Sequence, residues 1–463
     1  MRTRAHEMSK QIIDGRNESL DALFCRHLDR ALLGRRSGRL IEVTGAQVKV
    51  AGVGLRIGQL CELFHSDRAD RGQRVLGEVV GLTREAALVT LLGHVAGLSA
   101  STLVRPCADS HRVSVGNGLL GRVLDGLGQP LDEGASFDDM ATRSSAAAPP
   151  PPLSRPLIRS VLPTGVRAID GFLTAGRGQR FGIFAPAGTG KSTLLGMIAR
   201  GVGHGCICVI ALIGERGREV REFLEEILTP EQQKNTVVVV ATSDRPSMER
   251  IKAAYTATTI AEYFRDQGRD VLLLFDSVTR FARALREIGL AAGEPAVRRG
   301  YPPSVFAALP GLVERAGPAS TANITAFYTV LLEDAEMADP IGEEIRSLLD
   351  GHIVLSPKLA GAGHYPAIDI RSSVSRVMSQ LVTPSALAVA ARCRELIARY
   401  EDAELLLQVG EYREGGDPIL DCAVAAHDDL VAFLKQRTDE LAGFGDVEMQ
   451  LGNIVQRHVG FRD

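Results

Sequence analysis

The chain has 463 residues, which is too long for one compact core and predicts several domains. Lys and Arg number 53 and Asp and Glu 56, so the net charge is −3, whereas a chain that acts on nucleic acid usually has a basic surplus. Seven scattered cysteines lack paired zinc spacing, and no stretch resembles a secretory signal or a membrane span, so we expect a cytoplasmic protein that reaches a membrane only through partners.

Residues 18–33 are predicted to form an amphipathic helix, within an N-terminal segment at 1–36. Apolar residues recur there at helical spacing, with charged residues between them. They are Leu20, Leu23, Phe24, Leu28, Leu32 and Leu33. This stripe could pack on the chain's own domain, dock to a partner protein or lie on a membrane surface. Acidic residues on the polar face disfavour the membrane.

Residues 37–106 contain short apolar strands separated by glycine, such as 47–51 and 86–92. Short strands with frequent turns are typical of a small β-barrel. The proline-rich stretch 146–156 predicts a semi-rigid connector, because consecutive prolines favour an extended conformation. A proline-docking motif for a partner is the alternative.

After the connector, apolar strands alternate with helical patterns. Runs such as 207–213 and 271–275 are almost continuously apolar, which indicates a parallel sheet covered by helices on both faces. Beyond about Ser379 the pattern is helical. We therefore expect an α/β domain at 107–378, which includes the connector, and a smaller helical domain at 379–463.

A phosphate-binding loop is predicted at residues 184–193, which read Phe-Ala-Pro-Ala-Gly-Thr-Gly-Lys-Ser-Thr between an apolar strand and a helical run. Gly188 and Gly190 allow backbone N–H groups to turn toward one anion at a helix N-terminus. Lys191 supplies a positive charge to the β/γ-phosphates, and the Ser192 hydroxyl can bind Mg²⁺. The residues expected to hold the nucleotide are Ala187, Gly188, Thr189, Gly190, Lys191, Ser192 and Thr193.

Two strand ends supply carboxylates beside this loop. Asp276 ends one apolar run, and ligands of open α/β sheets bind at the carboxyl ends of strands, so we expect Asp276 to hold Mg²⁺ directly or through water. Glu215 and Glu219 follow the strand at 207–213. Either could orient the attacking water, and their spacing does not choose between them. Together with the loop, these residues predict an enzyme that hydrolyses ATP with Mg²⁺.

These motifs together resemble the catalytic subunits of rotary ATPases. The resemblance is closest to the protein-export branch, which comprises flagellar export ATPases and the ATPases of type III secretion systems, and it runs from about Gly38 to about Gln408. Within this branch, stretches 239–250 and 281–290 favour type III secretion. The stretches that carry the resemblance are Thr164–Asp170, Ile213–Val220, Asp276–Leu285, Gly300–Phe306, Leu349–Ser356, His364–Asp369 and Ser373–Arg376.

The resemblance implies a RecA-like parallel-sheet ATPase core of α/β class, with a small N-terminal β-barrel domain and a C-terminal helical domain. It implies that Glu215 positions the attacking water and that Tyr365 stacks on adenine. Arg376 would be an arginine finger that acts in a neighbouring subunit's site, so that Lys191, Glu215 and Arg376 form the catalytic set. Two positions depart from the family pattern: Pro186 in the phosphate loop, and Pro357 where an arginine is usual.

The implied function is that of a homohexameric ATPase of a type III secretion system, which couples Mg-ATP hydrolysis to chaperone release, unfolding and export of substrates. A flagellar export ATPase is the alternative. A non-catalytic ring subunit is disfavoured because the catalytic set is complete, and an RNA-translocating hexamer because aromatic residues are few. The expected partners are a stalk or regulatory protein at the N-terminal helix, the export apparatus at the inner membrane and chaperone–substrate complexes, but no nucleic acid.

Overall fold

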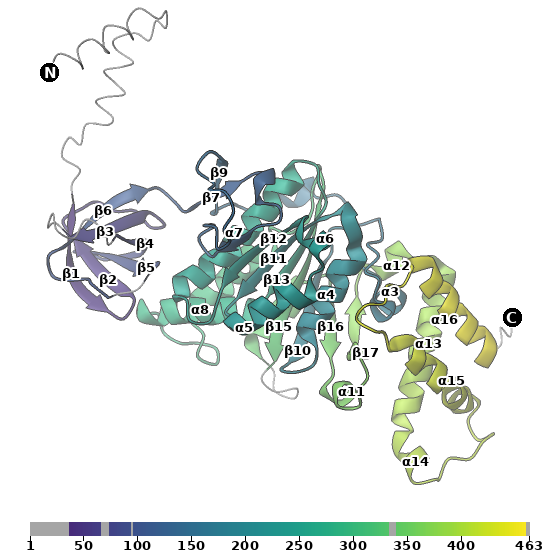
Figure 1. The fold of residues 1–463 in the computed structure, drawn as a ribbon. Helices are drawn as coiled ribbons and strands as arrows, with labels where there is room; N and C mark the ends of the chain where they lie inside the picture. Colours follow the sequence, from purple (N-terminus) through teal and green to yellow (C-terminus); the bar gives the residue numbers. More distant parts are fainter. Residues whose placement is uncertain (1–36, 66–73, 94–95, 333–338, 460–463) are drawn as a thin grey trace, which may run out of the picture.

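The computed structural model describes residues 37–65, 74–93, 96–332 and 339–459. These residues form a small barrel, a central sheet flanked by helices, and a group of C-terminal helices (Figure 1). The barrel and the C-terminal helices lie on opposite sides of the central sheet (Figure 1). The predicted N-terminal helix at 18–33 lies outside the described residues.

The barrel consists of six antiparallel strands that close in the order β1-β2-β5-β4-β3-β6. Alternate side chains fill its interior, as expected for strands with one buried face: Val48, Val50, Leu63 and Val104 are almost inaccessible. The strands are β1 (Gly38–Thr44), β2 (Gln47–Ala51), β3 (Leu60–His65), β4 (Val75–Leu82), β5 (Ala87–Leu91) and β6 (Thr102–Ala108).

The central sheet has the strand order β17-β16-β10-β15-β13-β11-β12-β8, and the short strand β14 (Gly317–Pro318) pairs with β15. Neighbouring strands from β16 to β8 are parallel, as predicted, but the edge strand β17 is antiparallel to β16. The strands are β8 (Val123–Asp125), β10 (Arg180–Pro186), β11 (Ile207–Ile213), β12 (Thr236–Ala241), β13 (Val271–Asp276), β15 (Asn323–Leu332), β16 (Gly351–Leu355) and β17 (Ile368–Ser375).

Helices cover both faces of this sheet, which explains why its central strands are mostly apolar on both sides. On one face the core includes side chains of α7 (Ser247–Asp266), α8 (Val278–Ala291), α9 (Pro303–Val313) and α10 (Pro340–Leu348). On the other face it includes α3 (Arg167–Phe172), α4 (Lys191–Val202) and the C-terminal helices. Shorter elements at the sheet's ends are η2 (Asn117–Leu119), η4 (Gly203–Gly205), α5 (Gly217–Glu222), the π-helical turn η5 (Phe223–Ile227) and α6 (Pro230–Gln233).

After the barrel, β7 (Arg112–Val115) and β9 (Ala141–Ser144) form a separate two-stranded sheet, and strand β8 of the central sheet lies between them in the sequence. The proline-rich stretch then leads to the remaining strands of the central sheet. Within that stretch only η3 (Pro152–Ser154) has regular structure. Arg155 ties it to the central domain, because its guanidinium donates to the carbonyls of Ala316, at 3.1 Å, and Glu314.

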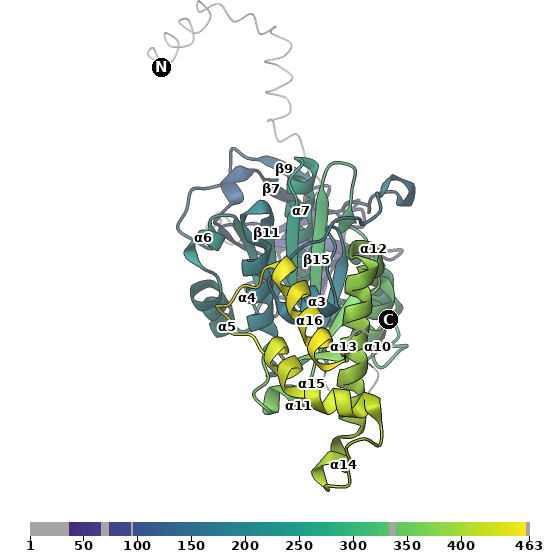
Figure 2. The ribbon, with the colours of Figure 1, turned by 90° about the vertical axis from the view of Figure 1, so that its right-hand side faces the viewer.

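The C-terminal helices are α12 (Met378–Leu381), α13 (Pro384–Asp402), α14 (Glu404–Gln408), α15 (Pro418–Leu434) and α16 (Phe444–His458). Figure 2 views the molecule from their side and shows α13, α15 and α16 in front of the central sheet. Two of them begin at a proline after a capping side chain, Thr383 or Asp417. Pro357 likewise starts the short helix α11 (Pro357–Gly361), with Ser356 as its cap. None of the described helices is long and apolar enough to cross a membrane.

Candidate active site

The Gly-Lys-Ser loop joins β10 to α4 at the carboxyl end of the sheet. β10 lies between β15 and β16, so the loop starts from a fixed strand. Gly188 and Gly190 have φ angles of 79° and 84°, which glycine adopts without strain. The Thr189 hydroxyl donates to the Pro186 carbonyl at 2.8 Å and closes the loop. Helix α4 begins at Lys191, so its first free N–H groups face the loop.

The other predicted nucleotide-binding residues of the loop lie around this turn. Ala187 is exposed beside Gly188, whereas Ser192 and Thr193 belong to the first turn of α4, the former partly buried and the latter exposed. Pro186, the departure from the family pattern, is the last residue of β10, level with Leu332 of β15. Its missing N–H therefore falls where the strand ends.

The ammonium of Lys191 lies between two carboxylates. Its Nζ atom is 2.5 Å from Asp276 Oδ1 and 3.2 Å from Glu215 Oε1, and its side chain is only 12% exposed. Burial disfavours the charge of Lys191, but the two carboxylates outweigh it and raise the pKa of the ammonium. The ends of β10, β11 and β13 thus bring three predicted site residues into direct contact.

Asp276 is held from a second side by a residue that the sequence did not single out. Thr329, on the neighbouring strand β15, donates its hydroxyl hydrogen to Asp276 Oδ1 at 2.6 Å. Both side chains are buried. A hydrogen bond to a buried carboxylate fixes its orientation as well as satisfying it. The sequence offers no signal that separates Thr329 from Thr325 and Tyr328, the other hydroxyl residues of the same strand.

Glu215 and Glu219 differ in their surroundings, although the sequence did not separate them. Glu215 is buried and contacts Lys191, whereas Glu219 lies one turn along in α5 with its side chain 41% exposed. Burial raises the pKa of Glu215, and a hydrogen bond with Glu219 raises it further against the opposing effect of Lys191. The same hydrogen bond lowers the pKa of Glu219.

Arg280 is a second neighbour that the sequence did not single out. It lies in the first turn of α8, four residues after Asp276, and its backbone N–H bonds to the Ser277 side chain at 3.3 Å. A Cβ on Gly214 would be 3.0 Å from the Arg280 Cβ, so glycine is needed where β11 leads into Glu215. The positive charge of Arg280 also opposes the rise in the pKa of Glu215.

Tyr365 flanks the phosphate loop. A Cβ placed on Gly190 would lie 3.5 Å from Tyr365 Cε1 and 3.6 Å from Cδ1, so the ring is next to the loop's last glycine. The side chain is 44% exposed, which leaves one ring face open to a planar group. The Tyr365 carbonyl accepts a hydrogen bond of 2.9 Å from the Gln436 N–H.

Arg376 lies at the opposite end of the strands from the phosphate loop. Because β17 is antiparallel to β16, its last residue Ser375 is level with Gly351, which is level with Phe181 at the start of β10. The phosphate loop follows the far end of β10. Arg376 is exposed and donates through Nη2 to the Arg346 carbonyl at 3.4 Å. The fold therefore gathers Lys191, Glu215, Asp276 and Tyr365 and separates Arg376 from them.

Comparison with known proteins identifies the family. Residues 165–375 match the nucleotide-binding domain of the ATP synthase alpha/beta family, and residues 382–453 match the T3SS EscN ATPase C-terminal domain. The type 3 secretion system ATPase of Xanthomonas euvesicatoria is 53% identical over 92% of this chain and 95% of its own length. The chain belongs to the type 3 secretion system ATPase family.

Further relatives place this family beside the flagellar one. The flagellum-specific ATP synthase of Bacillus subtilis is 47% identical over 88% of this chain and 92% of its own. A solved structure of the assembled ATPase EscN in complex with its central stalk EscO, from enteropathogenic E. coli, covers 90% of this chain and 100% of that chain at 47% identity with a TM-score of 0.82. The predicted fold and resemblance are confirmed, and the chain is an ATPase with a nucleotide substrate.

Proposed function

We propose that this ATPase forms a homohexameric ring in a type III secretion system and couples Mg-ATP hydrolysis to chaperone release, unfolding and export of secreted proteins. The observation that supports the catalytic part most is the contact of Lys191 with both Asp276 and Glu215 at the end of three parallel strands. A buried cation held by two acids at a phosphate loop is the arrangement that a polyanionic substrate can enter.

Nucleotide binding uses the loop and the two side chains that flank it. The N–H groups around Gly188 and Gly190 and the ammonium of Lys191 face the β/γ-phosphates, while Tyr365 stacks on the adenine. Phosphate oxygens give Lys191 new anionic partners, which releases Asp276 and Glu215 from the ion pairs that they make with it. Loop residues Ala187 to Thr193 thus form the phosphate-binding part of the site.

The donor set suits Mg²⁺, because the Ser192 hydroxyl and the Asp276 carboxylate are hard oxygen ligands at the start of α4 and the end of β13. Such a cation usually takes one or two protein oxygens and completes its shell with phosphates and water. Bound there, it would neutralise charge on the transferring phosphoryl group. Thr329 keeps the Asp276 carboxylate in place for this role.

Glu215 positions the attacking water. Of the two glutamates, it is the one that contacts Lys191. Burial raises its pKa toward the range in which a carboxylate works best as a base. Glu219 supports it through the hydrogen bond that joins the two carboxyl groups.

The site is completed across a subunit interface by Arg376. Phe181 and Ala187 are six residues apart along β10, which is about 20 Å at ~3.3 Å per residue, and Arg376 is level with the start of that strand. Its distance from its own phosphate loop supports a role in the site of another subunit. An arginine supplied in trans stabilises charge during phosphoryl transfer.

The partners follow from the family. EscN has been solved with a central stalk protein, and we propose an equivalent stalk or regulatory protein for this chain, docked in part by the segment at 18–33 that the sequence predicts to be helical. We also propose that the ring is cytoplasmic and meets the inner membrane peripherally, through the export apparatus, where it receives chaperone–substrate complexes. Nucleic acid is not among its partners.

A chromosomal Lys191→Ala allele tests this function. The expected result is loss of type III substrates from the culture supernatant, with normal swimming and flagellar filaments. The exposed Lys234, replaced in the same way, is the matched control and should leave secretion intact. Lost swimming with normal secretion would instead establish the flagellar alternative.

A further inference from the structure

Gln436 is a buried polar residue just after α15 that joins three distant segments. The residue is only 5% exposed, and both the amide nitrogen and the amide oxygen of its side chain have hydrogen-bond partners. Nε2 donates to the carbonyls of Gly165, at 2.7 Å, and Glu440, at 2.9 Å, while Oε1 accepts from the Arg167 N–H at 2.8 Å. Its backbone N–H donates to the Tyr365 carbonyl at 2.9 Å.

The Tyr365 contact links Gln436 to the nucleotide site. The Tyr365 ring lies beside Gly190 of the phosphate loop, so a shift of the Tyr365 backbone would move the ring across the entrance of that loop. Within the described residues, the Gln436 N–H is the donor that ties the Tyr365 carbonyl to the C-terminal region.

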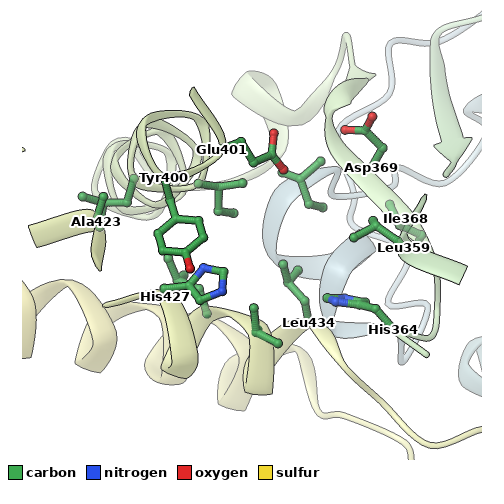
Figure 3. A pocket seen from close by; sticks show the side chains of 14 residues that line it. Leu359, His364, Ile368, Asp369, Tyr400, Glu401, Ala423, His427 and Leu434 are labelled. Atoms are coloured by element: carbon green, nitrogen blue, oxygen red, sulfur yellow. The ribbon is translucent and has the colours of Figure 1, made fainter. Parts of the chain in front are cut away.

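The segments that carry Tyr365 and Gln436 border a cavity. It lies between residues 359–370 and helices α13 and α15 and has a volume of about 100 Å³. Figure 3 shows His364 and Leu434, the residues one and two positions before Tyr365 and Gln436, on its wall. A cavity supplies no contacts on that side. The hydrogen bond from Gln436 is thus a directional contact to Tyr365 in a part of the fold that borders a cavity.

Gln436 also reaches the helix that carries Lys191. Its acceptor Gly165 is in tight contact with the end of α4, since a Cβ on Gly165 would lie 3.0 Å from the Gly201 Cα. The side-chain amide of Gln436, whose backbone N–H bonds to Tyr365, is thus also bonded to a segment that contacts the C-terminal end of α4.

Arg167 holds the same joint without touching Tyr365. Its guanidinium donates to the carbonyls of Phe433, at 2.7 Å, and Lys435, at 2.5 Å, and pairs with Glu440. Arg167 therefore helps to attach the C-terminal helices to the central domain without contacting Tyr365. Attachment of the helices and positioning of Tyr365 can thus be separated experimentally.

We propose that Gln436 is a positioning residue for the adenine end of the nucleotide site, which holds Tyr365 in register with the phosphate loop and couples the C-terminal helices to base recognition. The proposal rests on the proposed adenine contact of Tyr365. Gln436 bonds directly to the Tyr365 backbone but reaches α4 only near Gly201, at the end far from Lys191. It should therefore affect ligands that carry a base and spare ligands that consist only of phosphates.

Binding by the full-length protein tests this, with Mg²⁺ and either a non-hydrolysable ATP analogue or inorganic tripolyphosphate as the probe. Gln436→Ala should weaken the ATP analogue by roughly fivefold or more, as expected for coupled residues in contact, and leave tripolyphosphate unchanged. In a Tyr365→Ala background, Gln436→Ala should have no further effect. Arg167→Lys, the matched control, should lower the melting temperature but keep the preference between the two probes.

Three outcomes would contradict the proposal. Equal weakening of both probes, or effects of Gln436→Ala and Tyr365→Ala that simply add, would show that Gln436 only stabilises the fold. A Tyr365→Ala variant with unchanged affinity for the ATP analogue would overturn the adenine role of Tyr365 and this inference with it. If Gln436→Ala does not fold, Gln436→Glu keeps the size and the acceptor but loses both amide donors, and the same comparison applies.

Discussion

Lys191 is contacted by two carboxylates that are held in different ways. Asp276 is fixed by the Thr329 hydroxyl and is almost inaccessible, whereas Glu215 sits at the start of a loop and shares a hydrogen bond with Glu219. Removing the partner of a buried charge costs much more stability than removing the partner of a surface charge. Substitution of Lys191 should therefore leave both acids without their cationic partner as well as weaken phosphate binding.

The assignment of the water-positioning carboxylate can be tested with isosteric changes. Glu215→Gln should keep affinity for ATP but reduce the hydrolysis rate by about 10²–10⁴-fold, the usual contribution of a general base. Glu219→Gln should retain most of the activity, because its side chain is more exposed and does not contact Lys191. Steady-state hydrolysis and nucleotide binding measure the two effects. Near-normal turnover in Glu215→Gln together with a loss in Glu219→Gln would reverse the assignment.

Several site residues could be predicted at this scale because they are contiguous or end a strand. The loop around Lys191 has its own sequence pattern, and Asp276 and Glu215 follow apolar runs. Thr329 and Gln436 could not be predicted, since their importance depends on neighbours 53 and 71 or more residues away that only the fold brings close. The roles assigned to the site residues stay predictions until they are measured.

At the scale of elements, the direction of β17 decides which functional residues can meet. It begins just after Tyr365, at the end of the sheet that carries the phosphate loop, and it ends just before Arg376, at the opposite end. The parallel strands could be predicted because most of them are nearly continuous apolar runs, buried on both faces. The direction of β17 could not, because an edge strand with alternating exposure has the same pattern in either direction.

The packing of α4 gives a prediction about stability. A Cβ on Gly201 would lie 1.6 Å from the Thr164 carbonyl oxygen, so Gly201→Ala should force the helix away and cost about 1–3 kcal/mol of unfolding free energy. Gly217→Ala in α5 is the matched control, since nothing lies within 4 Å of its Cβ position. Urea or thermal unfolding compares them. Identical stability of the two variants would show that α4 does not approach Thr164 this closely.

On the scale of the whole molecule, the barrel, the central sheet and the C-terminal helices follow one another in chain order (Figure 1). The phosphate loop and Arg376 lie at opposite ends of the strands of the same sheet. This geometry suits a ring in which each subunit gives a phosphate loop to one interface and an arginine to the other. The domain boundaries at 36/37, 106/107 and 378/379 remain predictions.

The N-terminal segment is predicted to dock a partner and to be dispensable for catalysis. Deletion of residues 1–34 should preserve the ATPase activity and melting temperature of the isolated protein but abolish co-purification with the stalk protein and delivery to the membrane. If the apolar stripe packs on the barrel instead, the deletion should lower the melting temperature, because each exposed large apolar side chain costs roughly 1.5–3 kcal/mol. A destabilised protein that still binds the stalk would contradict the docking prediction.

The most direct test of a shared site is to mix two inactive variants of the full-length protein. Lys191→Ala removes the phosphate-loop cation and Arg376→Ala removes the arginine finger, so neither should hydrolyse ATP alone. A random equimolar ring would contain intact interfaces at roughly a quarter of its positions, because every interface pairs two subunits head to tail. We predict that mixing restores about that fraction of wild-type turnover. No recovery on mixing, or a specific activity that stays flat when the wild-type protein is diluted to monomers, would contradict catalysis between subunits.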